Sequence, residues 1–417
     1  MAPASKTLPS ISIRSATKTA TWFRWRRRCC RLNRYEPPRR SDHTESAMSA
    51  SFTVEQQQFR DVIRSFFAAK SPESVVRETM ASEHGYDPQL WAALADQLGV
   101  QGLSIPEEYG GSGFSFNETA LVLEEAGRSL VCAPLLASAI ATTTLLNSDD
   151  ELAKERWLPT IASGDTIATV AWVEDDGRWD APTVNVTATR GRGGWNLQGC
   201  KSFVLDGEIA SVILVVAKGD DGVGLFAVEG GDSRLTRSAM TTLDPTRRLA
   251  RIEMDGVPAY RVGAPGPGEK IVSDVARIAV VALACEQVGV AGRVLDMAVE
   301  YACQRVQFGR PIGSFQAIKH LCADMMAGVE AARAAAVAAA RGVSERSERL
   351  DELAAIAGSV CSETCLNAAR DNIQIHGAIA VTWEYPAHLY FKRAISDDLL
   401  FGDPAYHRES LAHVIGL

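Results

Sequence analysis

One stretch of seventeen residues, QRVQFGRPIGSFQAIKH (304–320), combines side chains that suit a phosphate-bearing aromatic ligand. Arg305 can donate two parallel hydrogen bonds to a pyrophosphate. Phe308 offers a face on which an adenine can stack, and the amides of Gln307 and Gln316 can both donate and accept hydrogen bonds. The stretch therefore predicts a ligand site, and the alternative is a helix–loop–helix corner built around a buried arginine.

Further along the chain, the segment QIHGA adds two residues of the same kind. Gln374 supplies another amide, and Gly377 supplies backbone that a ligand can approach closely because no side chain intervenes. No metal site is predicted. The nine cysteines form no CxxC pair, and Glu384 and His388 have no third ligand nearby.

The elements that would position these residues fall into three groups, and the fold class is mainly α with a central β domain. Helical patterns fill residues 48–164, where Thr53 with Gln56 forms a capping box. Short β-branched segments in 165–264 predict an antiparallel sheet, sandwich or small barrel. Long, Ala-rich helical patterns in 265–417 predict a four-helix type of bundle.

Residues 1–47 differ from the rest, since they carry a charge of about +8 while the remainder carries about −16. They are read as a basic disordered leader, with a transit peptide or a nucleic-acid or membrane arm as alternatives. The acidic remainder argues against nucleic acid as a partner. The sequence contains no run of eighteen apolar residues, so no membrane-spanning helix is predicted. Scattered cysteines and a preference for Arg (34) over Lys (9) favour the bacterial cytoplasm over the mitochondrial matrix.

The order of these three regions resembles the acyl-CoA dehydrogenase family over nearly all of residues 50–415. Four blocks carry the resemblance, and the third is the most specific of them: PEEYGGSG (106–113), GCKSFVLDG (199–207), YACQRVQFGRPIGSFQAIKHLCADM (301–325) and QIHGAIAVTWEYPAHLYFKRA (374–394).

The resemblance implies an oxidoreductase that dehydrogenates a fatty or steroid acyl-CoA at Cα–Cβ with FAD. It also implies a homo- or hetero-oligomer, a dimer of dimers, with electron-transfer flavoprotein as acceptor. In the family, a carboxylate removes the α-proton and the flavin takes the β-hydride. The positions of Arg305, Gln307, Phe308, Gln316, Gln374 and Gly377 reach across the dimer to the ADP half of the neighbour's FAD.

The chain departs from the family pattern where the flavin ring and the base belong. The segment VAWVEDDGRWD (170–180) lacks the hydroxyl donors that the family places beside the ring. The two family positions for the catalytic glutamate hold Phe401 and Ala279, neither of which is an acid. The nearest acids are Asp403 and Glu286. Their alternative, purely structural roles are a helix N-cap for Asp403 and an ion-pair partner for Glu286.

Two functions follow from these departures. The chain is either an acyl-CoA dehydrogenase with a relocated base, for which Asp403 is a weak candidate, or a non-catalytic subunit that completes the FAD site of a catalytic paralogue. A flavin oxidase or monooxygenase of the same fold is a third possibility. The asymmetry of the motifs favours the second function, because the residues that serve a neighbour are kept and those that serve the chain's own flavin are missing.

Overall fold

The computed structural model describes residues 53–179, 184–191, 194–264 and 268–417. Residues 1–47, which were predicted to be a basic leader, lie outside the described residues. Asp180, the last residue of the segment 170–180, lies outside them too. The first described region is helical, with six α-helices: α2 (Val54–Lys70), α3 (Glu73–Met80), α4 (Pro88–Ala93), α5 (Phe116–Ser129), α6 (Leu135–Asn147) and α7 (Glu151–Ala162).

The starts of these helices follow from local chemistry. The predicted capping box is confirmed, since the Thr53 side chain accepts from the Gln56 backbone N–H and the Gln56 side chain accepts in return. Ser115 and Glu118 form a second capping box before α5. Each box satisfies backbone donors that the first helical turn leaves without partners.

The central region is a seven-stranded sheet in which β5 pairs with both β4 and β7, closing the strands into a small barrel. The predicted small barrel is confirmed, and among the described strands the antiparallel pattern fails only where β1 and β2 each pair with β4 in parallel. Alternating hydrophobicity indicates on which face of the sheet a side chain lies, but it does not indicate whether neighbouring strands run parallel or antiparallel. The strands are β1 (Ala168–Ala171), β2 (Thr187–Gly191), β3 (Gly194–Leu205), β4 (Val212–Gly219), β5 (Gly222–Glu229), β6 (Leu235–Ala239) and β7 (Leu249–Val262).

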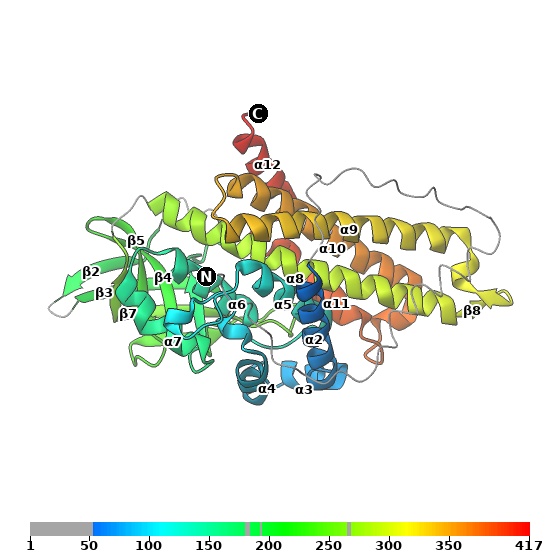
Figure 1. The fold of residues 1–417 in the computed structure, drawn as a ribbon, viewed down its shortest axis with the longest axis horizontal. Helices are drawn as coiled ribbons and strands as arrows, with labels where there is room; N and C mark the ends of the chain where they lie inside the picture. The colour runs from blue at the N-terminus through cyan, green and yellow to red at the C-terminus, as the bar shows by residue number, and fades with distance from the viewer. Residues whose placement is uncertain (1–52, 180–183, 192–193, 265–267) are drawn as a thin grey trace, which may run out of the picture. The chain divides into compact units, whose positions relative to one another are not determined.

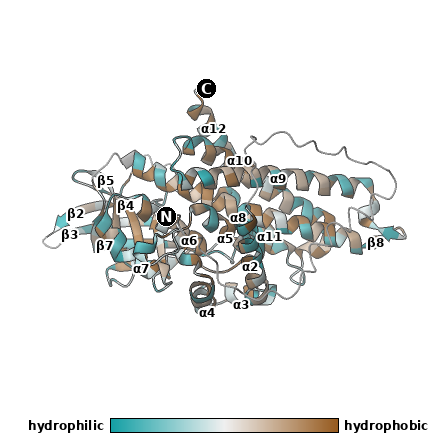
Figure 2. Ribbon diagram, viewed as in Figure 1, coloured by the Kyte–Doolittle hydropathy of each residue, from teal (hydrophilic) through white to brown (hydrophobic). Residues whose placement is uncertain are grey.

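The C-terminal region is built from long helices that lie side by side, with a two-stranded hairpin after the first of them (Figure 1). Figure 2 shows hydrophobic residues along β4 and hydrophilic residues at the hairpin. The elements are α8 (Gly268–Gln304), β8 (Val306–Gln307), β9 (Arg310–Pro311), α9 (Gln316–Ser344), α10 (Leu350–His376), α11 (Ala387–Leu399) and α12 (Pro404–Val414).

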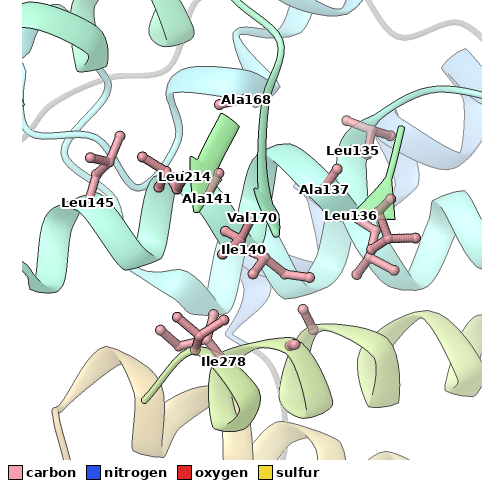
Figure 3. Packing of buried hydrophobic residues seen from close by; sticks show 14 of the residues in the cluster. Leu135, Leu136, Ala137, Ile140, Ala141, Leu145, Ala168, Val170, Leu214 and Ile278 are labelled. Carbon is pink, nitrogen blue, oxygen red and sulfur yellow. The ribbon is translucent and has the colours of Figure 1, made fainter. Parts of the chain in front are cut away.

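Helix α8 is the centre of the molecule's packing and contacts α5, α6, α9, α10 and α11. Its Lys270–Gln304 segment is long and apolar enough to cross a membrane by length and composition, but 94% of its most apolar window is buried in the protein. In Figure 3, Ile140 of α6 lies between strand residue Val170 and Ile278 of α8. The apolar character of α8 is therefore explained by its place in the core.

Candidate functional site

The β8–β9 hairpin presents the first group of predicted site residues. Its turn is Phe308-Gly309, and both residues have positive φ, 53° and 75°. That pairing is typical of a two-residue type I′ hairpin turn. A positive φ is rare for a bulky residue, and Phe308 is also 90% exposed. The hairpin thus holds an aromatic ring out into solvent at some conformational cost, with Gln307 exposed beside it.

The ends of α8 and α10 are held together by aromatic contacts. The rings of Tyr301 and His376 stack with centroids 4.2 Å apart, and His376 Nε2 lies 2.9 Å from the hydroxyl of Tyr385. Burial lowers the pKa of His376, so its ring is neutral at pH 7. Because of this packing, Arg305 just after α8 and Gln374 in the last turn of α10 belong to the same end of the bundle.

The predicted cofactor residues at this end are chemically suited to the ADP half of an FAD. Arg305, Gln374 and Gly377 are exposed, as is Gln316 at the start of α9. The alternative of a corner built on a buried arginine is wrong, since Arg305 is open to solvent. A guanidinium, three amides and an aromatic face are therefore available to a ligand from outside this chain.

A second group of residues forms a packed set of rings at the edge of the β domain, here called the aromatic cluster: Trp172, Trp179, Phe203 and Phe401. The ring centroids of Trp172 and Phe401 are 5.3 Å apart, and those of Trp179 and Phe401 are also 5.3 Å apart. Trp179 lies 6.0 Å from both Trp172 and Phe203. Phe401 is only 2% exposed.

The aromatic cluster brings together the two predicted departures from the family pattern. Trp172 and Trp179 come from the segment that lacks hydroxyl donors, and Phe401 is the residue that the resemblance places at the position of the base. A phenyl ring can neither accept the α-proton of a substrate nor hydrogen-bond a flavin ring. The side chains of the aromatic cluster therefore offer neither a hydroxyl donor for the ring half of an FAD nor a group that could abstract a proton.

A buried lysine hydrogen-bonds to the segment that carries Trp172. Lys201 Nζ donates to the backbone oxygen of Trp172 at 3.0 Å and to the carboxylate of Glu174 at 2.9 Å. Lys201 is fully buried. Burial lowers its pKa, an effect that the hydrogen bond to Glu174 opposes. The aromatic cluster is thus a fixed part of the fold.

The acids nearest to the two base positions are engaged elsewhere. Asp403 is exposed and caps α12, accepting from the Tyr406 N–H at 2.7 Å. Glu286 accepts hydrogen bonds from Arg247 and Arg393, and Ala279 is fully buried in α8. Both acids therefore have the structural roles that local chemistry assigns them, an N-cap and an ion-pair partner.

Sequence reasoning missed the surroundings of Glu286. Arg393, Asp244 and Arg247 lie more than thirty residues away from it along the chain, and Arg393 is more than a hundred away. No local spacing could have joined them. Part of the aromatic cluster could be noticed in the sequence, because two tryptophans stand out in a segment that usually carries hydroxyl donors. Their packing on Phe401 could not.

Comparison with known proteins agrees with this architecture. The model of the acyl-CoA dehydrogenase N-terminal domain matches residues 53–165, and that of the C-terminal domain matches residues 273–416. Acyl-CoA dehydrogenase IpdE2 of Mycobacterium tuberculosis is 36% identical over 353 residues, which are 84% of this chain and 94% of that protein.

Two solved structures are similar throughout the fold. A variant of the steroid acyl-CoA dehydrogenase Tcur3481-Tcur3483 has a TM-score of 0.79 at 29% identity, covering 87% of this chain and 97% of that one. The ChsE4-ChsE5 complex from Mycobacterium tuberculosis has a TM-score of 0.80 at 28% identity, covering 88% and 99%. By both sequence and structure, the chain belongs to the acyl-CoA dehydrogenase family of FAD-dependent oxidoreductases.

Proposed function

We propose that this chain is the subunit of a heteromeric acyl-CoA dehydrogenase that completes the FAD site of a catalytic relative and carries no base of its own. The observation that carries the proposal is the packing of Phe401 against Trp172 and Trp179. A buried phenyl ring at the position of the base leaves this chain unable to remove an α-proton there.

The exposed hairpin supports the other half of the proposal. Arg305 would donate to the pyrophosphate of the neighbour's FAD, Phe308 would stack on its adenine, and Gln307, Gln316 and Gln374 would hydrogen-bond the ADP portion. The bound FAD supplies the hydride acceptor of the reaction. This chain's contribution is to hold and orient the cofactor, and the partner supplies the base.

The solved relatives favour an assembly of unlike subunits. One of them is a complex of two differently named proteins, and the other has a paired name and is called a steroid enzyme. On this basis we assign to the complex an acyl-CoA thioester derived from a steroid. A dimer of dimers, electron-transfer flavoprotein as electron acceptor and the bacterial cytoplasm complete the proposal.

The second function, an ordinary dehydrogenase whose base has moved to Asp403, makes an opposite prediction. The test compares two variants of the complex formed with a family member that has glutamate at the position of Phe401. Asp403→Asn in this chain should leave turnover largely intact, whereas replacing the partner's glutamate should remove the typical 10²–10⁴-fold contribution of a general base. A hundredfold loss of rate from Asp403→Asn, with flavin still bound, would make this chain the catalytic one.

A further inference from the structure

Three acids and two arginines are buried together where the β domain meets the bundle, here called the charge cluster: Asp244, Arg247, Glu286, Arg393 and Asp397. Asp244 and Arg247 come from the loop between β6 and β7, Glu286 from α8, and the other two from α11. Each is at most 9% exposed, and Asp397 is fully buried. Charges at this depth need partners, because removing them from water is costly.

Two of the three acids accept hydrogen bonds from these arginines. Glu286 accepts hydrogen bonds from both Arg247 and Arg393. Asp244 accepts from Arg393 Nε and from Thr246, whose backbone N–H and hydroxyl lie 2.9 Å and 2.6 Å from its carboxylate. The two guanidinium charges are therefore matched by the two carboxylates that accept their hydrogen bonds.

Asp397 is the acid that remains. One of its carboxyl oxygens lies 3.2 Å from a guanidinium nitrogen of Arg247, which is ion-pair distance, but neither oxygen accepts a hydrogen bond from any residue that the structure describes. A small cavity of about 30 Å³, room for about two water molecules, lies against Arg247, Glu286 and Arg393. Asp206, a fourth acid, also lines that cavity.

We infer that Asp397 is a carboxylic acid in the folded protein, and that its ionisation would place an unmatched charge between the β domain and α11, which leads into the Phe401 loop. Asp397 lies in the last turn of α11, shortly before Phe401, and its backbone oxygen accepts from Gln287 Nε2 at 3.2 Å. Asp397 is thus a positioning residue for the aromatic cluster. The inference does not depend on the assignment of a subunit role to the chain.

The charged surroundings support the inference. Burial raises the pKa of Asp397 to about 7, and the negative charges of Glu286 and Asp244 act in the same direction against Arg247 and Arg393. Burial likewise raises the pKa of Asp206 to about 7, opposed by Arg247, Arg393 and Arg248. Two thiols beside the cluster, Cys132 and Cys365, have pKa values raised by burial and carry no charge at pH 7.

The pH dependence has a definite sign. The unfolded chain loses the Asp397 proton near pH 4, whereas the folded chain keeps it to about pH 7. Between these two values the folded state binds one more proton than the unfolded state. Stability therefore falls as pH rises through this window, and the folding constant drops about tenfold per pH unit from this group alone. Above the window both states are ionised and the loss is complete.

The test compares the full-length protein with Asp397→Asn, which keeps the shape of the protonated acid without a titrating proton. Denaturant unfolding between pH 5 and 7 should show the wild-type folding constant falling about tenfold per pH unit relative to the variant. Near-UV circular dichroism should show a pH-dependent change in wild type that the variant lacks, because Trp172 and Trp179 pack on Phe401. Equal pH slopes in the two proteins would overturn the inference.

The neighbouring residue gives a matched control. Asp398 lies on the same helix and accepts from the Ser362 hydroxyl at 2.9 Å, so Asp398→Asn should keep the wild-type pH slope. If Asp397→Asn does not fold, infrared spectra of Asp206→Asn decide the matter. A protonated-carboxyl band at pH 6 that disappears by pH 8 supports the inference, and its absence at pH 6 contradicts it.

Discussion

At the scale of single residues, the chain keeps one half of a cofactor site and lacks the other half. Two phenylalanines mark the contrast, because Phe308 is 90% exposed on a hairpin turn and Phe401 is 2% exposed inside the aromatic cluster. Both have positive φ, an unfavourable conformation for a bulky residue. Strain of this kind is retained where the surrounding structure requires it, at binding and switching sites above all.

The two phenylalanines should respond in opposite ways to truncation. Phe401→Ala removes a ring packed between two tryptophans, so it should lower the free energy of unfolding by about 3–5 kcal/mol. Phe308→Ala should change that free energy by less than about 0.5 kcal/mol, because the ring is exposed, and should instead weaken flavin retention by the complex. Denaturant unfolding and flavin absorbance separate the two effects. Equal stability losses would show that our account of the hairpin is wrong.

Arg305 offers a sharper test of the hairpin's role. Arg305→Lys keeps the charge and loses the paired donor geometry of the guanidinium. Losing one charge-assisted hydrogen bond costs about 1.5–3 kcal/mol, so the complex should bind FAD about ten- to a hundredfold more weakly. Equilibrium dialysis of the complex measures this. Arg408→Lys, on exposed α12, is the control and should leave FAD affinity unchanged. Unchanged affinity in Arg305→Lys would remove Arg305 from the cofactor site.

At the scale of elements, close helix packing depends on particular glycines. A Cβ added to Gly289 in α8 would overlap the carbonyl oxygen of Glu124 in α5, whose backbone cannot move aside. A Cβ at Gly292, one turn further, would meet only the ends of Arg128 and Arg333 side chains, at 3.6 Å and 3.8 Å. The same helix therefore contains an obligatory glycine and a replaceable one.

Alanine substitution should distinguish these two glycines. Gly289→Ala should force α5 and α8 apart and lower the free energy of unfolding by about 1–3 kcal/mol, as overpacking does. Gly292→Ala should be neutral or should stabilise the protein by up to about 1 kcal/mol, because alanine favours the helix over glycine. Thermal unfolding of both variants measures the difference. A stable Gly289→Ala protein would mean that the two helices can separate without cost.

The sequence alone predicts many of the helices and strands and their order along the chain. The capping residues of α2 and α5 and the succession of helical, β and helical regions are local patterns, and the structure has them. The parallel pairing of β1 with β4 was not predictable from alternation. The charge cluster joins Asp244 to Arg393 across some 150 residues, and such pairs become visible only in the folded chain.

At the scale of the whole molecule, the candidate cofactor residues and the aromatic cluster lie on different parts of the fold. The hairpin follows α8 at the end of the long helices away from the strands (Figure 1), while Trp172 and Phe203 belong to the β domain. The residue types of the hairpin and of the aromatic cluster can be read from the sequence. The sequence could not show that Phe401 and the tryptophans pack on one another, because that contact joins the segment after α11 to the segment after β1.

The most direct test of our central claim is the flavin content of the purified protein. The full-length chain, produced alone with excess FAD, should show no flavin absorbance and no turnover of an acyl-CoA. Produced with a family member that has glutamate at the position of Phe401, it should give a complex with one flavin per pair of unlike subunits. A yellow, active homo-oligomer with one flavin per chain, purified without any partner, would contradict the account.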